Sequence, residues 1–182
     1  MNCKVVGTLD NGAQIEDCGD MVGGDIDVDT TVELMKRYSW ADSTSNAILK
    51  IANEIKSKYS TDFEQIKAAY FFVVNTITYV PDGKNEVVVS PRHALTWRRK
   101  GDCDCMTTSV ISILIALGFR NLYAKVIAWK PDTTGLNEFT HVYAMALIPS
   151  LDVVIPLDPV MEASGFGNEK QPVIRTKIYK IA

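Results

Sequence analysis

The sequence RKGDCDCMTTSVISILIALG, residues 99–118, joins a short charged segment to a long apolar one. Asp102 belongs to the residue types that cap the start of a helix, and Gly118 stands where a helix commonly ends. Apolar side chains occupy most positions from Val110 to Leu117, so a helix formed here would be apolar on most of its sides. Such a helix must be enclosed by other elements, and we predict that it is the central helix of the domain.

Two cysteines, Cys103 and Cys105, stand at the start of this predicted helix, each directly after an aspartate. A zinc site would need two further ligands, from the remaining cysteines or from the histidines, namely Cys3 and Cys18, or His93 and His141. Side chains two residues apart on a helix point about 200° away from each other, which is poor geometry for chelation. We therefore expect no metal and no other cofactor. Cys3 and Cys18 are the only cysteines suited to a disulfide, which we do not expect in a chain without an export signal.

A cysteine at the start of a buried helix suits nucleophilic chemistry. Backbone N–H groups and the positive end of the helix dipole lie beside its sulfur and stabilise the thiolate. The same N–H groups can donate to the negative charge that develops on a substrate carbonyl. Asp104 opposes thiolate formation, so the dipole and a protonated histidine must outweigh this carboxylate if Cys103 is to be activated.

A histidine and an aspartate follow in segments that should place their side chains close together. His141 opens the strand-like run HVYAMALI, and Asp158 ends the next run, VVIPLD. The tight turn PSLD joins the two runs, so they should be antiparallel neighbours, with Asp158 near His141. Pro156 leaves their register open. Each residue alone is more often structural than catalytic, but Cys, His and Asp together are more specific.

The remaining segments predict helices before the central helix and strands after it. The expected caps of three helices are Thr30 or Thr31, Ser43 or Ser45, and Thr61 with Glu64 in a capping box. Strands are expected over residues 122–129, 141–148 and 153–158, with one more in the tail. This order predicts an α+β fold in which an antiparallel sheet packs on the central helix.

Residues 1–29 differ from the rest of the chain. Asp10, Asn11 and Gly12 form a strong hairpin signal, and a Gly- and Asp-rich segment follows that we interpret as an extended arm. We therefore divide the chain into a hairpin or arm, 1–29, and a main domain, 30–182. The arm packs on the body or engages a partner, and the sequence leaves both open.

Length and composition bound the class of protein. The chain has 182 residues, 47% of them hydrophobic and 23% charged, which is typical of one globular domain. The net charge of −3 gives no electrostatic case for binding nucleic acid or an anionic membrane, and we interpret the cations of residues 98–100 as a solvated loop. Without a visible signal sequence or membrane span, we expect a cytoplasmic protein.

Three motifs carry a resemblance to a known family. GDCDCMTTSVISILIALGF resembles the cysteine motif of the transglutaminase-like superfamily, where Gly-x-Cys opens a long buried helix. FTHVYAMALI resembles its His-bearing strand and IPLDPV its Asp-Pro strand, in the same chain order. DFEQIKAAYFFVVNTITYVPD is similar to the segment that precedes the cysteine in that family. The match extends over residues 45–160.

This resemblance implies a papain-like fold with a Cys-His-Asp triad. Cys103 would be the nucleophile, His141 the base and Asp158 the orienting group. Cys105 falls where many bacterial and phage relatives carry a second Asp, and His93 matches no catalytic position. Two further residues could line the cleft or donate to an oxyanion, namely Tyr79 and Trp97.

The expected function is that of a cysteine hydrolase, a peptidase or amidase that forms a thioester with an amide substrate in a protein or peptide. An amine acceptor in place of water would make the protein a crosslinking enzyme. The alternative is a phage virion or assembly protein that uses the fold as a binding module and contacts a partner through residues 1–29; it would then be located in the virion.

Overall fold

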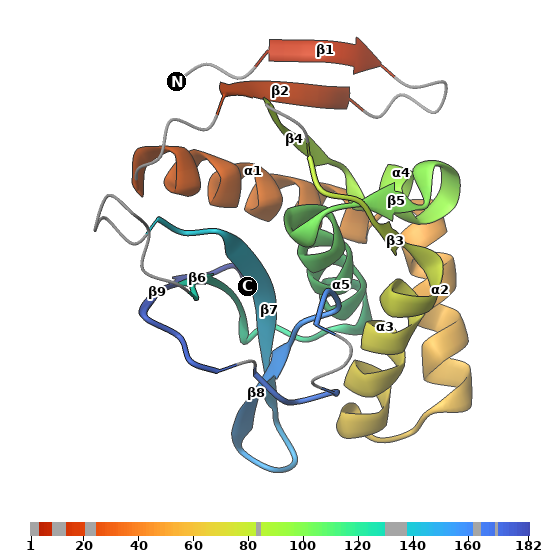
Figure 1. Ribbon diagram of the computed structural model, residues 1–182. Coiled ribbons are helices and arrows are strands. Elements are labelled where there is room, and N and C mark those ends of the chain that lie inside the picture. The colour runs from red at the N-terminus through yellow and green to blue at the C-terminus, as the bar shows by residue number, and fades with distance from the viewer. Residues whose placement is uncertain are drawn as a thin grey trace.

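The computed structural model describes residues 4–8, 14–20, 25–82, 85–129, 138–161, 165–169 and 171–182. Strands β1 (Lys4–Thr8) and β2 (Gln14–Asp20) form the predicted antiparallel hairpin, whose turn lies outside the described residues. Strand β4 (Asn85–Val89) pairs with β2 and completes a three-stranded sheet in the order β1-β2-β4. This sheet lies at one end of the molecule, next to helix α1 (Figure 1).

Helix α1 (Asp25–Ser43) begins earlier than predicted. The expected cap at Thr30 or Thr31 is wrong, as is the extended backbone expected just before it. Val28 lies four residues before Val32. Because the helix already includes Val28, both side chains lie on the same face and are buried. The helix crosses residue 29, and the division of the chain into 1–29 and 30–182 remains a prediction.

Helices α2 (Asn46–Lys58) and α3 (Asp62–Thr76) follow the capping rules. Ser45, one of two predicted caps, accepts a hydrogen bond from Ile48 N at the start of α2. Thr61 and Glu64 form the predicted capping box at the start of α3. The apolar residues at helical spacing along α3 and at its end are buried: Ile66, Ala69, Tyr70, Val73 and Ile77.

The connection between α3 and the central helix is irregular. It contains β3 (Thr78–Tyr79), β4, the short helix α4 (Pro91–His93), the π-helix η1 (Ala94–Arg98) and β5 (Lys100–Gly101). Strands β3 and β5 pair in parallel, so the residues just before the central helix are tied to the end of α3. Arg99, between η1 and β5, has a φ of 48°, a left-handed conformation that is uncommon for a residue other than glycine.

Helix α5 (Cys103–Leu117) is the predicted central helix. Asp102 caps its start, and Gly118, with a φ of 107°, ends it. It runs between α2 and α3 on one side and a four-stranded sheet on the other, with α1 also packed against it (Figure 1). Nearly all of its side chains are buried, so it forms the middle of the core.

The four-stranded sheet has the order β8-β7-β6-β9 and is antiparallel throughout. Its strands are β6 (Leu122–Ala128), β7 (His141–Ile148), β8 (Val153–Leu157) and β9 (Arg175–Lys180), as the sequence predicts. The fold is therefore α+β, with the cysteine-bearing helix packed on an antiparallel sheet. Among the described residues, no helix is both long and apolar enough to cross a membrane.

Candidate active site

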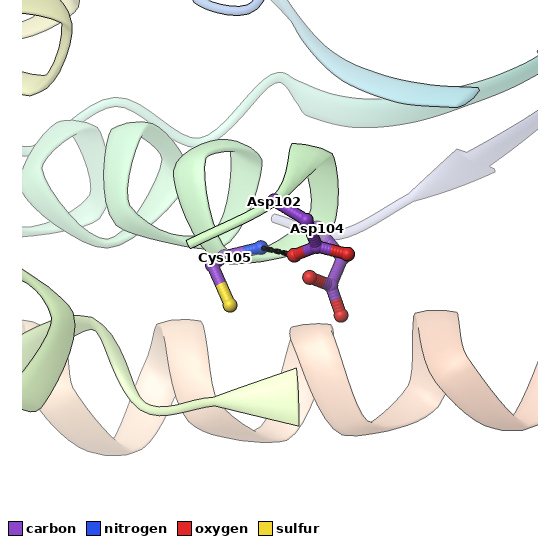
Figure 2. A group of neighbouring side chains, drawn as sticks. All are labelled: Asp102, Asp104 and Cys105. Atoms are coloured by element: carbon purple, nitrogen blue, oxygen red, sulfur yellow. Dashed lines mark hydrogen bonds between the residues drawn. The ribbon is translucent and has the colours of Figure 1, made fainter. Parts of the chain in front are cut away.

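Asp102 organises the first turn of α5. Its Oδ1 accepts a hydrogen bond from the Cys105 backbone N–H at 3.4 Å (Figure 2). Its carbonyl oxygen accepts a hydrogen bond from Met106 N at 3.1 Å. The predicted helix cap is therefore present. It fixes the turn that carries Cys103, because a capped helix start leaves little freedom to its first residues.

Gly101, directly before the cap, permits a close approach of two backbone segments. A Cβ added at this position would lie 2.6 Å from the Cβ of Cys105, closer than real Cβ atoms approach. The Gly101 carbonyl also accepts a hydrogen bond from Val80 N at 2.9 Å. The glycine of the Gly-x-Cys motif is thus explained by packing of β5 against the first turn of α5.

The two cysteines of this turn have different surroundings. Cys103 is half-buried, whereas the Cys105 side chain is 1% exposed and its Sγ lies 3.9 Å from the carbonyl oxygen of Val87. Burial raises the pKa of the Cys105 thiol well above its usual value, and the charges of Asp104 and Asp102 raise this pKa further. Cys105 is therefore held as a neutral thiol, which leaves Cys103 as the candidate nucleophile.

His141 and Asp158 form a buried pair. His141 Nε2 lies 2.8 Å from Asp158 Oδ2. The predicted proximity of these two side chains is therefore present. The β7–β8 register pairs Ala144 with Leu157, so Asp158 comes directly after the paired segment, on the side toward the start of β7. Pro156 is accommodated because β8 is an edge strand, where a missing N–H is tolerated.

The Asp158 carboxylate is itself held in place. Its Oδ1 accepts hydrogen bonds from Val160 N at 3.1 Å and Met161 N at 3.3 Å. The hydroxyl of Tyr70, from α3, donates to the Asp158 carbonyl oxygen at 3.1 Å. Oδ1 is thus bound to backbone while Oδ2 faces His141, so the carboxylate can fix the orientation of the imidazole ring.

A buried hydrogen bond joins the start of α5 to the start of β7. The Thr107 hydroxyl donates to the Val142 carbonyl oxygen at 3.1 Å. Thr107 lies one helical turn after Cys103, on the same side of α5, and Val142 directly follows His141. This contact brings the two element starts that carry Cys103 and His141 to the same part of the core.

Two aromatic rings adjoin the His141 imidazole. Trp129 stacks on it, with ring centroids 4.6 Å apart and an angle of 28° between the planes. The Tyr143 ring lies 5.8 Å away at 35°. The sequence reasoning missed Trp129. The β6–β7 register could have found it, because Ile127 pairs with His141 and Trp129 follows two residues later.

Tyr79, a predicted cleft residue, lies within electrostatic reach of Cys103. Burial raises the pKa of the Tyr79 hydroxyl, and the charges of Cys103, Asp102 and Asp82 contribute to the rise. The Tyr79 side chain is 47% exposed, so a substrate could reach it. Tyr79 pairs with Gly101 in the β3–β5 pair, so it lies near the start of α5.

Trp97 and His93 lie in the irregular connection. Trp97, on η1, is 64% exposed and lines a surface pocket together with Arg92, Thr96 and residues 44–47. His93 is buried on α4, so it is a packing residue rather than a surface residue.

Comparisons with known proteins identify the family. The family model described as the transglutaminase-like superfamily matches residues 49–159, more than half of the chain. The chain belongs to the transglutaminase-like superfamily. The matched range contains the whole of α5, the start of β7 and Asp158, and so all three residues of the predicted triad.

A solved structure has the same fold. It is the crystal structure of a putative cysteine protease from Cytophaga hutchinsonii, with a TM-score of 0.51 and 14% sequence identity. The match covers 98% of this chain and 74% of that chain. No curated protein matches the sequence. The fold of this transglutaminase-like domain is therefore shown, with α5 bearing Cys103 on an antiparallel sheet.

A second group of side chains shares the first turn of α5 in this transglutaminase-like domain. Asp102, Asp104 and Cys105 are all buried, and one ligand atom from each lies within 4.8 Å of the others (Figure 2). Metal binding requires a deprotonated thiol, which the raised pKa of Cys105 disfavours. The Asp102 carboxylate is also occupied as the helix cap. Within this group, Asp102 therefore has a structural role as the helix cap.

Proposed function

We propose that the protein is a cysteine hydrolase of the peptidase or amidase type, which acts on an amide through Cys103, His141 and Asp158. The observation that carries this proposal is the buried His141–Asp158 pair, 2.8 Å apart, on the strand that Thr107 joins to the cysteine-bearing helix. Because Nε2 faces Asp158, the other ring nitrogen, Nδ1, is the atom available for the proton of the Cys103 thiol.

The reaction begins with transfer of the Cys103 proton to His141 Nδ1. The thiolate attacks the amide carbonyl carbon and forms a tetrahedral intermediate, whose oxyanion is stabilised by backbone N–H groups at the start of α5. The carbon–nitrogen bond then breaks, and His141 returns the proton to the leaving amine. The product is a thioester on Cys103 and a free amine.

Water completes the cycle. His141 takes a proton from the water molecule, whose oxygen attacks the thioester carbonyl, and the carbon–sulfur bond breaks. A carboxylic acid is released and the thiol is restored. An amine in place of water would form a new amide by the same steps. Tyr79 and Trp97 are proposed to line the cleft or to donate to the oxyanion.

The test compares two cysteines of the same helix turn. Cys103→Ala should abolish cleavage of any amide or peptide that the wild type cleaves. Cys105→Ala, the matched control, should retain cleavage, because its thiol is held neutral and buried. Turnover by Cys103→Ala at the wild-type rate would rule out the proposal.

The β1–β2 hairpin favours a second, compatible function, the binding of a virion or assembly partner. In the sheet order β1-β2-β4, strand β1 lies at the edge, and edge strands can pair with another chain. We propose residues 1–29 as the partner-binding segment and 30–182 as the transglutaminase-like domain. The test removes residues 1–20 and measures whether the protein still sediments with a virion or assembly partner. Sedimentation that is unchanged by the removal would contradict this role.

A further inference from the structure

Three ring contacts lie at alternate positions along the chain around the start of β7. The guanidinium of Arg175 lies 4.4 Å from the ring centroid of Phe139. The ammonium of Lys125 lies 5.8 Å from the ring centroid of Tyr143. Between them, at residue 141, a histidine faces Trp129. The two outer contacts involve permanent cations, and the middle one involves a group that becomes a cation only when it takes a proton.

The backbone before Trp129 is held from both sides. Thr140 N donates to the Ile127 carbonyl oxygen at 3.0 Å, and Ile174 N donates to the Ala128 carbonyl oxygen at 2.9 Å. These bonds join the end of β6 to the residues before β7 and β9. The indole is therefore presented to His141 by fixed backbone, which makes the stacking a stable feature of the fold.

The face of an indole ring carries negative electrostatic potential. A cation within about 6 Å of the ring centroid is stabilised, most strongly by tryptophan among the aromatic residues. The 4.6 Å separation of the Trp129 and His141 rings satisfies this condition. Stacking also fixes the plane of the imidazole, while the Nε2 contact with Asp158 fixes its rotation within that plane.

We propose that Trp129 is a positioning residue that stabilises the protonated ring of His141 and thereby maintains the Cys103 thiolate. This inference rests on the proposed function. The charged and titratable groups described near His141 are Asp158, which contacts Nε2, and Lys125, Glu169 and Arg175 around Tyr143 and Phe139; the proposed function adds Cys103 at Nδ1. Besides these groups, the rings of Trp129 and Tyr143 favour the cation without adding a charge, and the Trp129 ring is the nearer of the two.

The experiment measures alkylation of Cys103 by iodoacetamide as a function of pH, resolved by peptide mass spectrometry. In the wild type, alkylation should persist to acidic pH because the thiolate is paired with a protonated ring. Trp129→Leu should slow alkylation at neutral pH by up to about tenfold, because the neutral thiol–imidazole pair gains on the ion pair, while the rate at pH 9–10, where the thiol ionises beside a neutral ring, should stay at the wild-type value. Trp129→Phe should restore most of the neutral-pH rate, since a phenyl ring also has a negative face.

Trp40→Leu is the matched control. Trp40 donates from Nε1 to the Ile181 carbonyl oxygen at 2.9 Å and lies beneath Arg120, away from His141. Its loss should leave the pH profile unchanged. Thermal unfolding of each variant checks the fold, and Trp129→Met, which keeps a large apolar side chain, replaces Trp129→Leu if that variant does not fold.

Two results would overturn the proposal in different ways. A Trp129→Leu profile that matches the wild type at neutral pH, or falls equally at neutral pH and at pH 9–10, would show that Trp129 acts only in packing, while the proposed function would stand. A wild-type Cys103 that is alkylated no faster at acidic pH than an ordinary thiol would refute both the proposed function and the role of Trp129.

Discussion

At the scale of single residues, Cys103 and Cys105 show how one helix turn gives two thiols opposite properties. Their neighbours in the sequence are nearly identical, since each follows an aspartate. The difference arises from the fold, because β5 and β4 pack on Cys105 and leave Cys103 half-buried. Helical geometry predicted that the two side chains point in different directions, but only the structure shows which one is enclosed.

The carboxylate of Asp158 should be necessary for activity. In Asp158→Asn the side chain keeps its shape but loses the charge that favours a protonated His141, so we expect kcat/KM to fall by about two to four orders of magnitude. The measurement is cleavage of an amide or peptide that the wild type cleaves.

Asp152→Asn is the control for this substitution. Asp152 lies in the β7–β8 turn with a φ of 52°, a conformation that asparagine tolerates, so the variant should behave as wild type. An Asp158→Asn enzyme as active as this control would exclude the orienting role of Asp158.

At the scale of elements, the start of α5 is held by contacts to segments on both sides. The parallel β3–β5 pair holds the residues before it, and the Thr107–Val142 hydrogen bond ties its second turn to β7. The cysteine and histidine of the candidate site lie on different elements, so these contacts decide whether their side chains meet.

Gly101→Ala should displace the start of α5. The new Cβ would lie 2.6 Å from the Cβ of Cys105, and neither atom belongs to a flexible side-chain end, so we expect a loss of about 1–3 kcal/mol in unfolding free energy together with reduced activity. Denaturant unfolding and amide cleavage measure the two effects.

Gly118→Ala provides the comparison at the other end of α5. Its φ of 107° makes alanine costly, by about 1 kcal/mol, but no atom lies within 4 Å of the new Cβ. This variant should lose stability without a matching loss of activity. Equal effects of the two glycine variants on activity would argue against the packing role of Gly101.

Thr107→Val should lower both the unfolding free energy and the reactivity of Cys103. The substitution leaves the Val142 carbonyl without its hydrogen bond, which costs about 1–3 kcal/mol, and loosens the contact between α5 and β7. Alkylation of Cys103 at mildly acidic pH should therefore slow.

Thr108→Val is the matched control, because the Thr108 hydroxyl donates within the helix, to the Asp104 carbonyl oxygen at 2.6 Å. We expect it to lose stability but to keep the wild-type alkylation rate. If both threonine variants slow alkylation to the same extent, the Thr107 contact has no special role.

At the scale of the whole molecule, the pH dependence of stability should carry a contribution from His93. Burial lowers the pKa of the His93 imidazole, and the nearby charges of Arg98 and Arg92 lower it further. Its Nδ1 makes no hydrogen bond within the part of the chain that the structure describes. The folded state therefore prefers the neutral ring.

The direction of this pH dependence follows from the number of protons that the folded and unfolded states bind. Below the unfolded-state pKa of about 6.5, the unfolded chain binds a proton that the folded chain resists, so the unfolding free energy falls as the pH drops toward the lowered pKa. In His93→Gln this part of the dependence should be absent. Urea unfolding at pH 7.5 and at several lower values measures it, and parallel curves for the two proteins would contradict the prediction.

The sequence predicted the elements that depend on local pattern and missed those that depend on distant partners. Helix α5, its caps and the strands of the main sheet follow from periodicity and from Asp102 and Gly118. The predicted start of α1 was wrong. Asp- and Gly-rich segments favour turns, but burial of Val28 favours an additional helical turn at the start of α1. The β2–β4 pairing joins segments far apart in the chain and carries no local signal.

The candidate site divides in the same way. Chain order and the tight turn after β7 predicted that Asp158 lies near His141, since both properties are local. The stacking of Trp129 and the hydrogen bond of Thr107 were not predicted, because each requires the register or packing of two elements. Local pattern thus predicts which side chains the site contains, and tertiary contacts determine how they are held.

The position of β4 has a consequence for the order in which this chain folds. During synthesis β1 and β2 are made before α1, α2 and α3, and the third strand of their sheet is made only after these helices. Ile15 pairs with Val89, so the contact closes a long loop and forms slowly. Until then the hairpin exposes two unpaired edges to neighbouring nascent chains. Slowing translation when residue 89 has just left the ribosome would give this sheet time to close before the cysteine-bearing helix emerges.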